Sequence, residues 1–331
     1  MPDKGDFAER GEGELFVQPD AEGFRGHNRT RPRGLVDKRT DVAKAVSSLV
    51  GDGDYVAVGG FGTNRIPTAV IHEMVRQKKR RLGLSGHTAT HDFQVLAAGG
   101  CLDRCDVAYV IGLEARGLSP VSRRLFEEGN IRSTEWTNGA LAWRYKAAAM
   151  GVPFLPARVM LGTDTFRYSS AETVRCPFTD MELLAVPALC PDVGIIHVHR
   201  ADRYGNCQID GITVSDLDLA RASKKLIVTA ERLIPHQEIR RRPERTAVPF
   251  FLVDAVIEVP YGSYPGNMPY EYYSDEEHLM EWMTAEREGR LEEFLATYVY
   301  GVKEHWEYVD LCGGIGRMQE LRRQEVFPDE Q

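Results

Sequence analysis

A short glycine-rich loop carries the strongest sign of chemistry in this sequence. Gly59-Gly60-Phe61-Gly62 follows the apolar run 55–58 and precedes Pro67, a residue suited to the first turn of a helix. Glycine lets a backbone approach a ligand closely, and the amides at a helix N-terminus attract negative charge. The spacing is not that of a dinucleotide fingerprint, and no Walker lysine follows. On these four residues alone, a tight strand-to-helix turn is the preferred interpretation.

A second polar group follows the next predicted strand. Its members, at and just beyond the end of the strand expected at 81–86, are Ser85, His87, Thr88 and His91. Open α/β sheets usually hold their ligands at this end of a strand. The two histidines have a spacing that suits a shared metal ion, but no third ligand is apparent. We therefore rank substrate contact first, a hydrogen-bonded structural histidine second and metal binding third.

Glu135, within the segment STEWTNG, is a separate candidate. The pattern puts it at the end of a strand and just before a helix, so that its carboxylate can reach the same cleft. Alternatively, it is a carboxylate at a helix start that the helix dipole stabilises. We favour the role in the site.

The elements that would position these residues alternate along the chain. Short apolar strands are predicted at 55–58, 81–86 and 106–112, and helices from Pro67 and over 119–130 and 137–150. Past Gly151 come three more apolar strand candidates, and the final helix is broken at 313–316. This alternation predicts an α/β protein with a mostly parallel sheet and helices on both faces. The Pro-, Gly- and Tyr-rich stretch 260–273 is expected to be an ordered loop.

Composition excludes several classes of protein. The 331 residues have a net charge of −8 and are 27% charged and 43% hydrophobic, which argues against disorder and against a dedicated nucleic-acid binder. We expect no membrane segment, a cytoplasmic location, and six cysteines that stay reduced. Residues 1–35 are interpreted as an irregular N-terminal extension, laid on the surface or left mobile, and 36–331 as one domain.

A longer string around the glycine loop changes the interpretation. Asp52-Gly53, Val56-Ala57-Val58, the loop itself and Pro67 together resemble the signature of the A (α) subunits of family I CoA-transferases. The resemblance extends over about 40–300 through the blocks RLGLSGHTATHDF, AAAMGVPFLPARVMLGTD, IIHVHRADRYGN and VDAVIEVPYGSYP, which look like glutaconate CoA-transferase α-subunits. Arg65 stands where the common signature has a glycine, and glutaconate-type α-subunits are similar in carrying Arg or Lys in this stretch.

The resemblance implies the NagB/RpiA/CoA-transferase-like fold, coenzyme A and acyl-CoA as substrates, and no metal. In the family, the nucleophile is a glutamate of the β-subunit, which attacks the acyl-CoA and then forms a glutamyl-CoA thioester. That glutamate lies in a Ser-Glu-Asn-Gly-like motif, which neither 128–130 nor 133–135 fits. The resemblance therefore implies a partner β-subunit, in an αβ or α2β2 assembly, and a carboxylic acid as the second substrate.

Within this chain, the resemblance implies that backbone amides of Gly59, Gly60, Phe61 and Gly62 meet the oxyanion that develops on the acyl carbonyl. Thr63, Asn64 and Arg65 would line the same pocket. Arg65 either pairs with a substrate carboxylate or CoA phosphate, or is a solvated arginine at the first turn of a helix. The basic runs 78–81 and 240–242 are expected to be solvated surface, although either can attract the phosphates of CoA.

The function that the sequence favours is the α-subunit of a heteromeric, glutaconate-type CoA-transferase. The first alternative is a CoA-thioester hydrolase, a ring-opening hydrolase or an acyl-CoA decarboxylase on the same fold. Relatives that hydrolyse a CoA-activated ring have a glutamate at the position of Glu135 that is thought to act as the base, but glutaconate-type α-subunits look similar there. The second alternative is a non-catalytic ligand-binding protein that reuses the scaffold.

Overall fold

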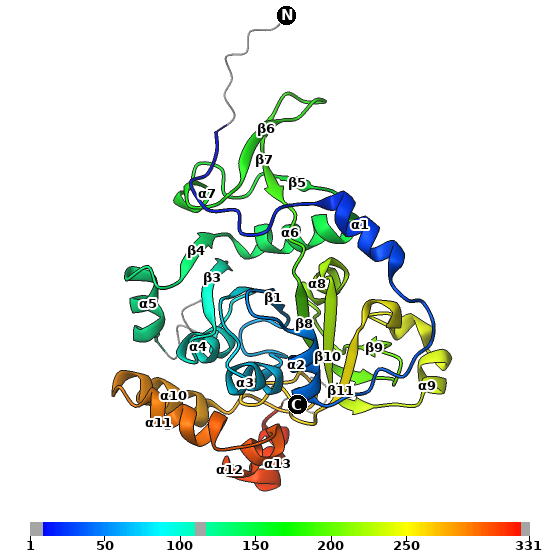
Figure 1. Ribbon diagram of the computed structural model, residues 1–331, viewed down its shortest axis with the longest axis vertical. Coiled ribbons are helices and arrows are strands. Elements are labelled where there is room, and N and C mark those ends of the chain that lie inside the picture. Colours follow the sequence, from blue (N-terminus) through cyan, green and yellow to red (C-terminus); the bar gives the residue numbers. More distant parts are fainter. Residues whose placement is uncertain (1–8, 110–116, 326–331) are drawn as a thin grey trace, which may run out of the picture.

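The computed structural model describes residues 9–109 and 117–325. Its central sheet has the strand order β11-β10-β8-β1-β2-β3-β4, with all neighbours parallel, and the short β9 pairs antiparallel to β8 (Figure 1). The strands are β1 (Tyr55–Val58), β2 (Leu82–Gly86), β3 (Leu102–Val107), β4 (Arg132–Glu135), β8 (Val193–Ala201), β9 (Cys207–Gln208), β10 (Lys225–Leu233) and β11 (Ala255–Glu258). The prediction of a mostly parallel sheet is confirmed.

Helices cover both faces of this sheet because its central strands are apolar on both sides. In β1, Val56 and Val58 belong to one buried core, while Tyr55 and Ala57 belong to the other. The first core lies under α2 (Val42–Leu49), α3 (Thr68–Arg76), α4 (His91–Ala98), α5 (Pro120–Glu127), α10 (Glu276–Arg287) and α11 (Leu291–Leu295). The second lies under α6 (Asn138–Met150), α7 (Asp164–Arg167) and α8 (Asp216–Ala222). The expected two-sided covering is therefore present.

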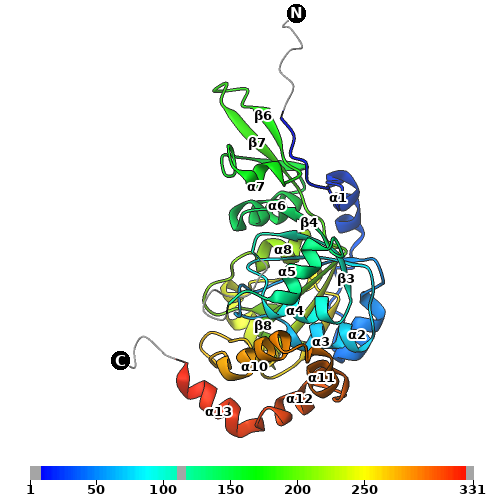
Figure 2. The same cartoon turned by 90° about the vertical axis from the view of Figure 1, so that its left-hand side faces the viewer.

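A second, smaller sheet projects from the body above α6 (Figures 1 and 2). It is antiparallel, with the order β5-β7-β6, and its strands are β5 (Phe154–Ala157), β6 (Glu172–Arg175) and β7 (Glu182–Pro187). The buried Arg144 of α6 holds it to the main sheet: its Nε donates to the carbonyl of Pro187 at 3.2 Å, and its guanidinium pairs with Asp106 of β3. Only two of the three strands predicted past Gly151 join the main sheet, because β7 belongs to this second one.

The N-terminal extension is more regular than predicted. Helix α1 (Ala21–Thr30) begins after Asp20, whose side chain accepts from the N–H of Gly23, and it buries Phe24 in the second core. The Arg31 side chain then donates to the carbonyls of Ser223 and Leu252. Residues 9–35 thus lie on the surface, which is one of the two expectations for the N-terminal extension. The prediction that the extension is irregular is wrong for α1.

The C-terminal part packs below the first core as a group of helices (Figure 2). After the loop 260–273 come the π-helical turn η3 (Ala296–Tyr300), α12 (His305–Leu311) and α13 (Gly314–Gln324). The break predicted at 313–316 is present, but it lies at 312–313, and 314–316 already belong to α13. Near β10 lie α9 (His236–Arg241), η1 (Pro243–Arg245) and η2 (Phe250–Leu252). The strand predicted at 106–112 is instead β3, which ends at Val107, and 110–112 lie outside the described residues. No described helix is long and apolar enough to cross a membrane.

Candidate active site

The glycine loop is a tight turn at the end of the central strand β1. Phe61 and Asn64 exchange backbone hydrogen bonds of 3.0 and 2.9 Å, which closes the turn over Gly62 and Thr63. Gly60 has φ +86°, and a Cβ there would lie 2.3 Å from the carbonyl oxygen of Asn64. Only glycine fits this position, because a side chain would be both strained and in collision.

Three segments that are distant in sequence hold the loop in place. The Thr90 hydroxyl, just before α4, donates to the carbonyl of Gly62 at 2.8 Å. From the loop 260–273, the Asn267 N–H donates to the carbonyl of Thr63 at 3.0 Å, and its side-chain amide donates to Asn64 Oδ1 at 2.7 Å. The third anchor is Asp216 at the start of α8. The turn is therefore rigidly mounted on the sheet.

Most of the amides expected to face a ligand are already used inside the chain. Gly59 N–H donates to the carbonyl of Ile195 at 2.8 Å, Gly60 N–H donates to Asp216 Oδ1 at 2.8 Å, and Phe61 N–H closes the turn. Within the described residues, the N–H groups of Gly62 and Thr63 make no hydrogen bond. The expectation that all four amides from Gly59 to Gly62 are available is therefore corrected. The free donors are the two at the tip of the turn.

Arg65 is neither solvated nor free. Its side chain is 0% exposed, its guanidinium forms an ion pair with the buried Asp216, and Nη2 donates to the carbonyl of Ile212 at 2.9 Å. The interpretation as a solvated arginine is wrong. In this arrangement Asp216 neutralises the guanidinium and also binds Gly60 N–H, so the Arg65–Asp216 pair supports the loop from behind.

The polar group after β2 lies next to the loop, and each member is buried and hydrogen-bonded. Ser85 Oγ lies 2.6 Å from the hydroxyl of Tyr145, and His91 Nε2 lies 3.0 Å from Thr68 Oγ1. Both are at most 4% exposed. Ser85 thereby connects β2 to α6, whereas His91, the first residue of α4, connects that helix to its neighbour α3.

His87 joins this group to the anchor of the loop. Its Nε2 lies 2.8 Å from the hydroxyl of Ser215, the residue before Asp216. Asn138 donates to the hydroxyl of the adjacent Thr88 at 3.2 Å. Burial lowers the pKa of His87, although Asn138 and the charge of Asp216 oppose this shift. His87 is therefore expected to be neutral at pH 7 and to act through hydrogen bonds.

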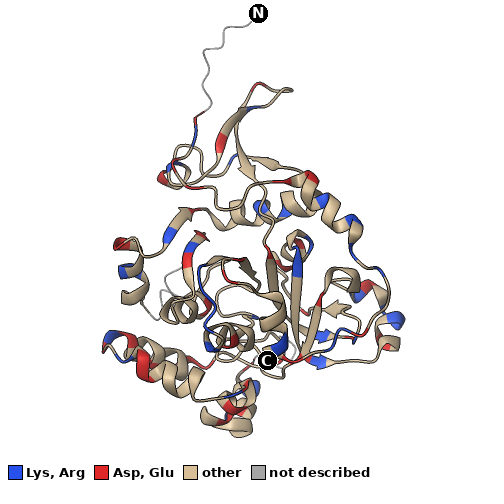
Figure 3. Cartoon of the chain, in the orientation of Figure 1, with Lys and Arg blue, Asp and Glu red and all other residues tan. Residues whose placement is uncertain are grey.

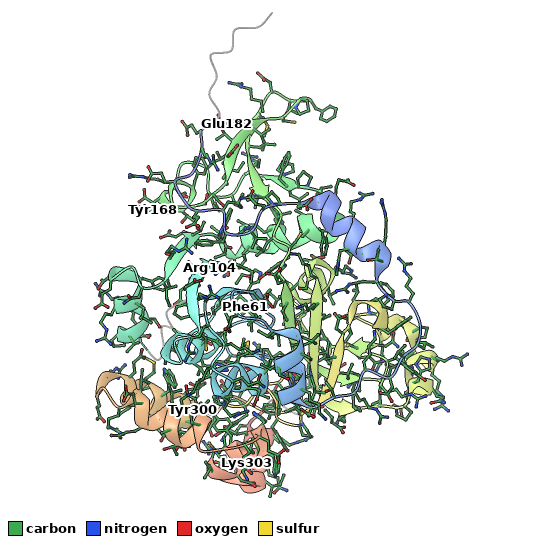
Figure 4. All side chains as sticks on the ribbon, in the orientation of Figure 1. Phe61, Arg104, Tyr168, Glu182, Tyr300 and Lys303 are labelled. Carbon is green, nitrogen blue, oxygen red and sulfur yellow. The ribbon has the colours of Figure 1, made fainter. Side chains whose placement is uncertain are left out.

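Glu135 is not brought together with the glycine loop. It is exposed at the end of β4, three strands from β1 in a sheet where neighbours are about 4.8 Å apart, which separates the two strand ends by about 14 Å. Its N–H donates to the carbonyl of Tyr168 at 3.1 Å, and Tyr168 lies well apart from Phe61 in Figure 4. Partial burial and the nearby charge of Asp164 raise the pKa of its carboxyl group.

The structure adds site residues that the sequence did not single out. Asp216, Ser215, Thr90 and Asn267 all bind the loop or the histidine beside it. The only local signal for one of them is the segment SDLDLA, in which a polar pair precedes a helix. Over the described ranges, no group of three side chains has the composition to hold a metal ion.

Comparisons with known proteins agree with this geometry. The model of the family "Coenzyme A transferase" matches residues 39–259. The A subunit of glutaconate CoA-transferase from Acidaminococcus fermentans is 31% identical over 287 residues, which cover 81% of this chain and 90% of that one. The A subunit of 3-oxoadipate CoA-transferase from Pseudomonas knackmussii is 32% identical over 270 residues, covering 80% and 94%.

Two solved structures extend the likeness to three dimensions. Glutaconate coenzyme A-transferase from A. fermentans superposes with a TM-score of 0.83 at 29% identity, over 88% of this chain and 96% of that one. A variant of the decarboxylase AibA/AibB superposes with a TM-score of 0.72 at 32% identity, over 78% and 97%. Strand order, glycine loop and family match agree, and the chain therefore belongs to the coenzyme A transferase family as an A-type chain.

Proposed function

We propose that this chain is the α-subunit of a heteromeric CoA-transferase that moves CoA from an acyl-CoA to a carboxylic acid, in the manner of the glutaconate-type enzymes. The observation that carries the proposal is the pair of unused N–H donors, Gly62 and Thr63, at the tip of a turn whose other N–H groups are bound. Preorganised backbone donors of this kind suit an oxyanion on an acyl carbonyl.

The nucleophile is assigned to a partner β-subunit. Among the described residues, the only carboxylate hydrogen-bonded to the loop is Asp216, and both of its oxygens are occupied, by Gly60 N–H and by Arg65. Asp216 is also 1% exposed, so attack on a substrate would require breaking a buried ion pair. Both named transferase relatives are themselves one subunit of an enzyme.

The proposed reaction passes through an anhydride and then a glutamyl-CoA thioester on the partner. A glutamate carboxylate of the partner adds to the thioester carbonyl, the oxyanion is held at Gly62 and Thr63, and its collapse breaks the C–S bond and releases CoA thiolate. The thiolate attacks the glutamyl carbonyl of the resulting anhydride, which releases the first acid and leaves a glutamyl-CoA thioester. The acceptor acid reverses both steps and leaves as the new acyl-CoA.

The polar group after β2 supports this site from behind the turn. Because burial lowers its pKa, His87 holds the Ser215 hydroxyl without adding positive charge beside the Arg65–Asp216 pair. Ser85, Thr88 and His91 are assigned the same supporting role, because their side chains bind residues of α6 and α3 beside the turn.

A decarboxylase is the second candidate, and the likeness to AibA/AibB favours it. In that reaction Glu135 would be the residue to take or give a proton, because its pKa is raised and its side chain is open to solvent. The position of Glu135 at the edge strand, about 14 Å from the loop, weighs against this candidate.

The direct test is to co-express the chain with its B-type partner and to supply pairs of acyl-CoA and free carboxylate, including glutaconyl-CoA with acetate. Chromatography of CoA esters should show the CoA ester of the added acid, here acetyl-CoA, and its formation should require both chains. Free CoA without that ester would contradict the transferase and favour the hydrolase. Carbon dioxide together with an acyl-CoA shortened by one carbon would contradict it and favour the decarboxylase. A Glu135→Gln complex measured in parallel separates the two, because only the second candidate requires that carboxylate.

A further inference from the structure

An arginine-lined hollow lies at the C-terminal end of β8 and includes part of the basic run 240–242. It has a volume of about 240 Å³ and is lined by Arg200, Gln208, Ile234, Glu238, Arg241, Arg242 and Arg245. Four arginines and one glutamate line it, and because Asp210 pairs with Arg200 the local charge is +2, in a chain whose net charge is −8. In Figure 3 the blue of α9 stands at the right-hand edge of the molecule.

Most of these guanidinium groups are free to bind an anion. Within the described residues, the side chains of Arg241, Arg242 and Arg245 make no hydrogen bond and no ion pair. Arg200 differs, because it is fixed on the wall by two hydrogen bonds to Asp210, of 2.8 and 2.6 Å, and one to Gln208. The hollow therefore combines one rigid arginine with three unpaired ones, and a concave wall strengthens their joint field.

Along the direction of the parallel strands, the hollow lies farther on than the glycine loop. Ile195 of β8 pairs with Val58 at the end of β1, and Arg200 comes five residues later, which places it about 16 Å beyond that end at about 3.3 Å per residue. A second hollow shares Arg245 with the first and is also lined by Gly211 and Tyr270. Its Gly211 precedes Ile212, whose carbonyl binds Arg65 behind the loop.

We propose that this arginine hollow binds the phosphate groups of coenzyme A while the thioester lies at the glycine loop. An extended pantetheine arm has a length comparable to the separation between the two places. Arginine suits phosphate because its planar fork forms paired hydrogen bonds to phosphate oxygens. This inference rests on the proposed function, and it gives this chain a share in holding CoA.

The test is titration calorimetry on the assembled complex with CoA, dephospho-CoA and pantetheine. The double variant Arg242→Gln/Arg245→Gln should bind CoA about 10-fold more weakly, because two charged contacts are lost, and should bind pantetheine unchanged. Raising the salt concentration should weaken CoA binding to the wild type more than to the variant.

A matched control is available at the opposite, N-terminal end of the parallel strands. Lys78→Gln/Arg81→Gln also removes two exposed charges, from the segment that leads into the N-terminal end of β2. This control should bind CoA as the wild type does. An equal loss in both variants would attribute the effect to net charge and would overturn the proposal.

Two further outcomes overturn it. One is unchanged CoA affinity in the Arg242/Arg245 variant, and the other is loss of assembly with the partner, which would make the hollow a contact between chains. The proposed function is tested separately by acyl transfer in the wild-type complex. A complex that binds CoA through the arginines but transfers nothing would refute the function and leave the hollow in place.

Discussion

The glycine loop and Glu135 both follow strands of one parallel sheet, yet their surroundings are opposite. The loop follows the central strand β1, where Asp216, Thr90 and Asn267 bind nearly all of its polar groups. Glu135 follows the edge strand β4, where its carboxylate is exposed. The contrast shows that the end of the central strand is surrounded by protein partners, whereas the end of the edge strand faces solvent.

At the centre, an unpaired buried group costs free energy, and all N–H groups from Gly59 to Arg65 except two have a partner among the described residues. The side-chain atoms Arg65 Nε and His87 Nδ1 are also buried there without a hydrogen bond to the described part of the chain. The two donors left over, on Gly62 and Thr63, therefore stand out as places for a ligand. At the edge strand, water can hydrate the Glu135 carboxylate. Its lack of a protein partner is therefore weaker evidence for a ligand than an unused donor at the centre. We accordingly propose that this chain contributes to the chemistry through the backbone of the loop.

The largest expected effect comes from removing the anchor of the loop. Asp216→Ala leaves the buried Arg65 without a counter-charge and should lower the free energy of unfolding by about 3–5 kcal/mol. The control is Asp218→Ala on the same helix, where the ion pairs are partly exposed and the loss should be about 1 kcal/mol or less. Urea unfolding of both variants measures the difference, and equal losses would contradict the supporting role of the pair.

Two glycines with the same backbone conformation separate collision from strain. Gly60 and Gly53 have φ +86° and +85°, but only at Gly60 does an added Cβ meet another atom, whereas Gly53 faces open space. Gly60→Ala should therefore cost about 1–3 kcal/mol more than Gly53→Ala and should remove most acyl transfer. Thermal unfolding and transfer rates of the two complexes test this. Matched behaviour would mean that the close approach at Gly60 is unimportant.

Glu135→Gln tests whether the exposed carboxylate at the edge strand takes part in the reaction. For a transferase whose nucleophile lies on the partner, kcat should change by less than about threefold, because this carboxylate lies far from the loop. A general base in a decarboxylase or hydrolase would instead contribute on the order of 100-fold or more. Burial and, to a smaller extent, the charge of Asp164 raise the pKa of Glu135. Asp164→Asn is the control in the same kinetic assay, because it removes a neighbouring carboxylate but keeps Glu135.

The smallest effect concerns pH, and it has opposite signs in the two regions. Burial lowers the pKa of His87, so the unfolded chain binds its proton more readily, and the stabilisation is lost as the pH falls below about 6.5. The raised pKa of Glu135 favours the folded state in acid, and this contribution is lost as the pH rises through the folded pKa.

Free energies of unfolding from about pH 5 to about pH 8 should show this pattern. His87→Asn should flatten the acid-side slope, and Glu135→Gln should steepen it slightly because it removes the opposing contribution. An unchanged slope in His87→Asn would mean that the histidine does not titrate differently in the folded and unfolded chain.

Local patterns predicted the strands and the glycine turn because apolar periodicity and glycine content are properties of neighbouring residues. They did not predict the burial of Arg65, because its partner Asp216 is 151 residues away in the sequence. They placed Glu135 correctly at the end of a strand just before a helix, but they did not predict its separation from the glycine loop, because the order of strands in a sheet is not written in any one segment. Helix α1 was missed because two glycines, Gly23 and Gly26, lower its intrinsic propensity, while the burial of Phe24 stabilises it.

The division of roles between the two chains, with backbone donors here and the nucleophile on the partner, can be measured by mass. The assembled complex is mixed with acyl-CoA and quenched in acid, and the intact mass of each chain is recorded. We predict that the partner gains the mass of CoA less one water, as a glutamyl-CoA thioester requires, and that this chain is unchanged. The same gain on this chain, or acyl transfer by this chain without a partner, would contradict that division.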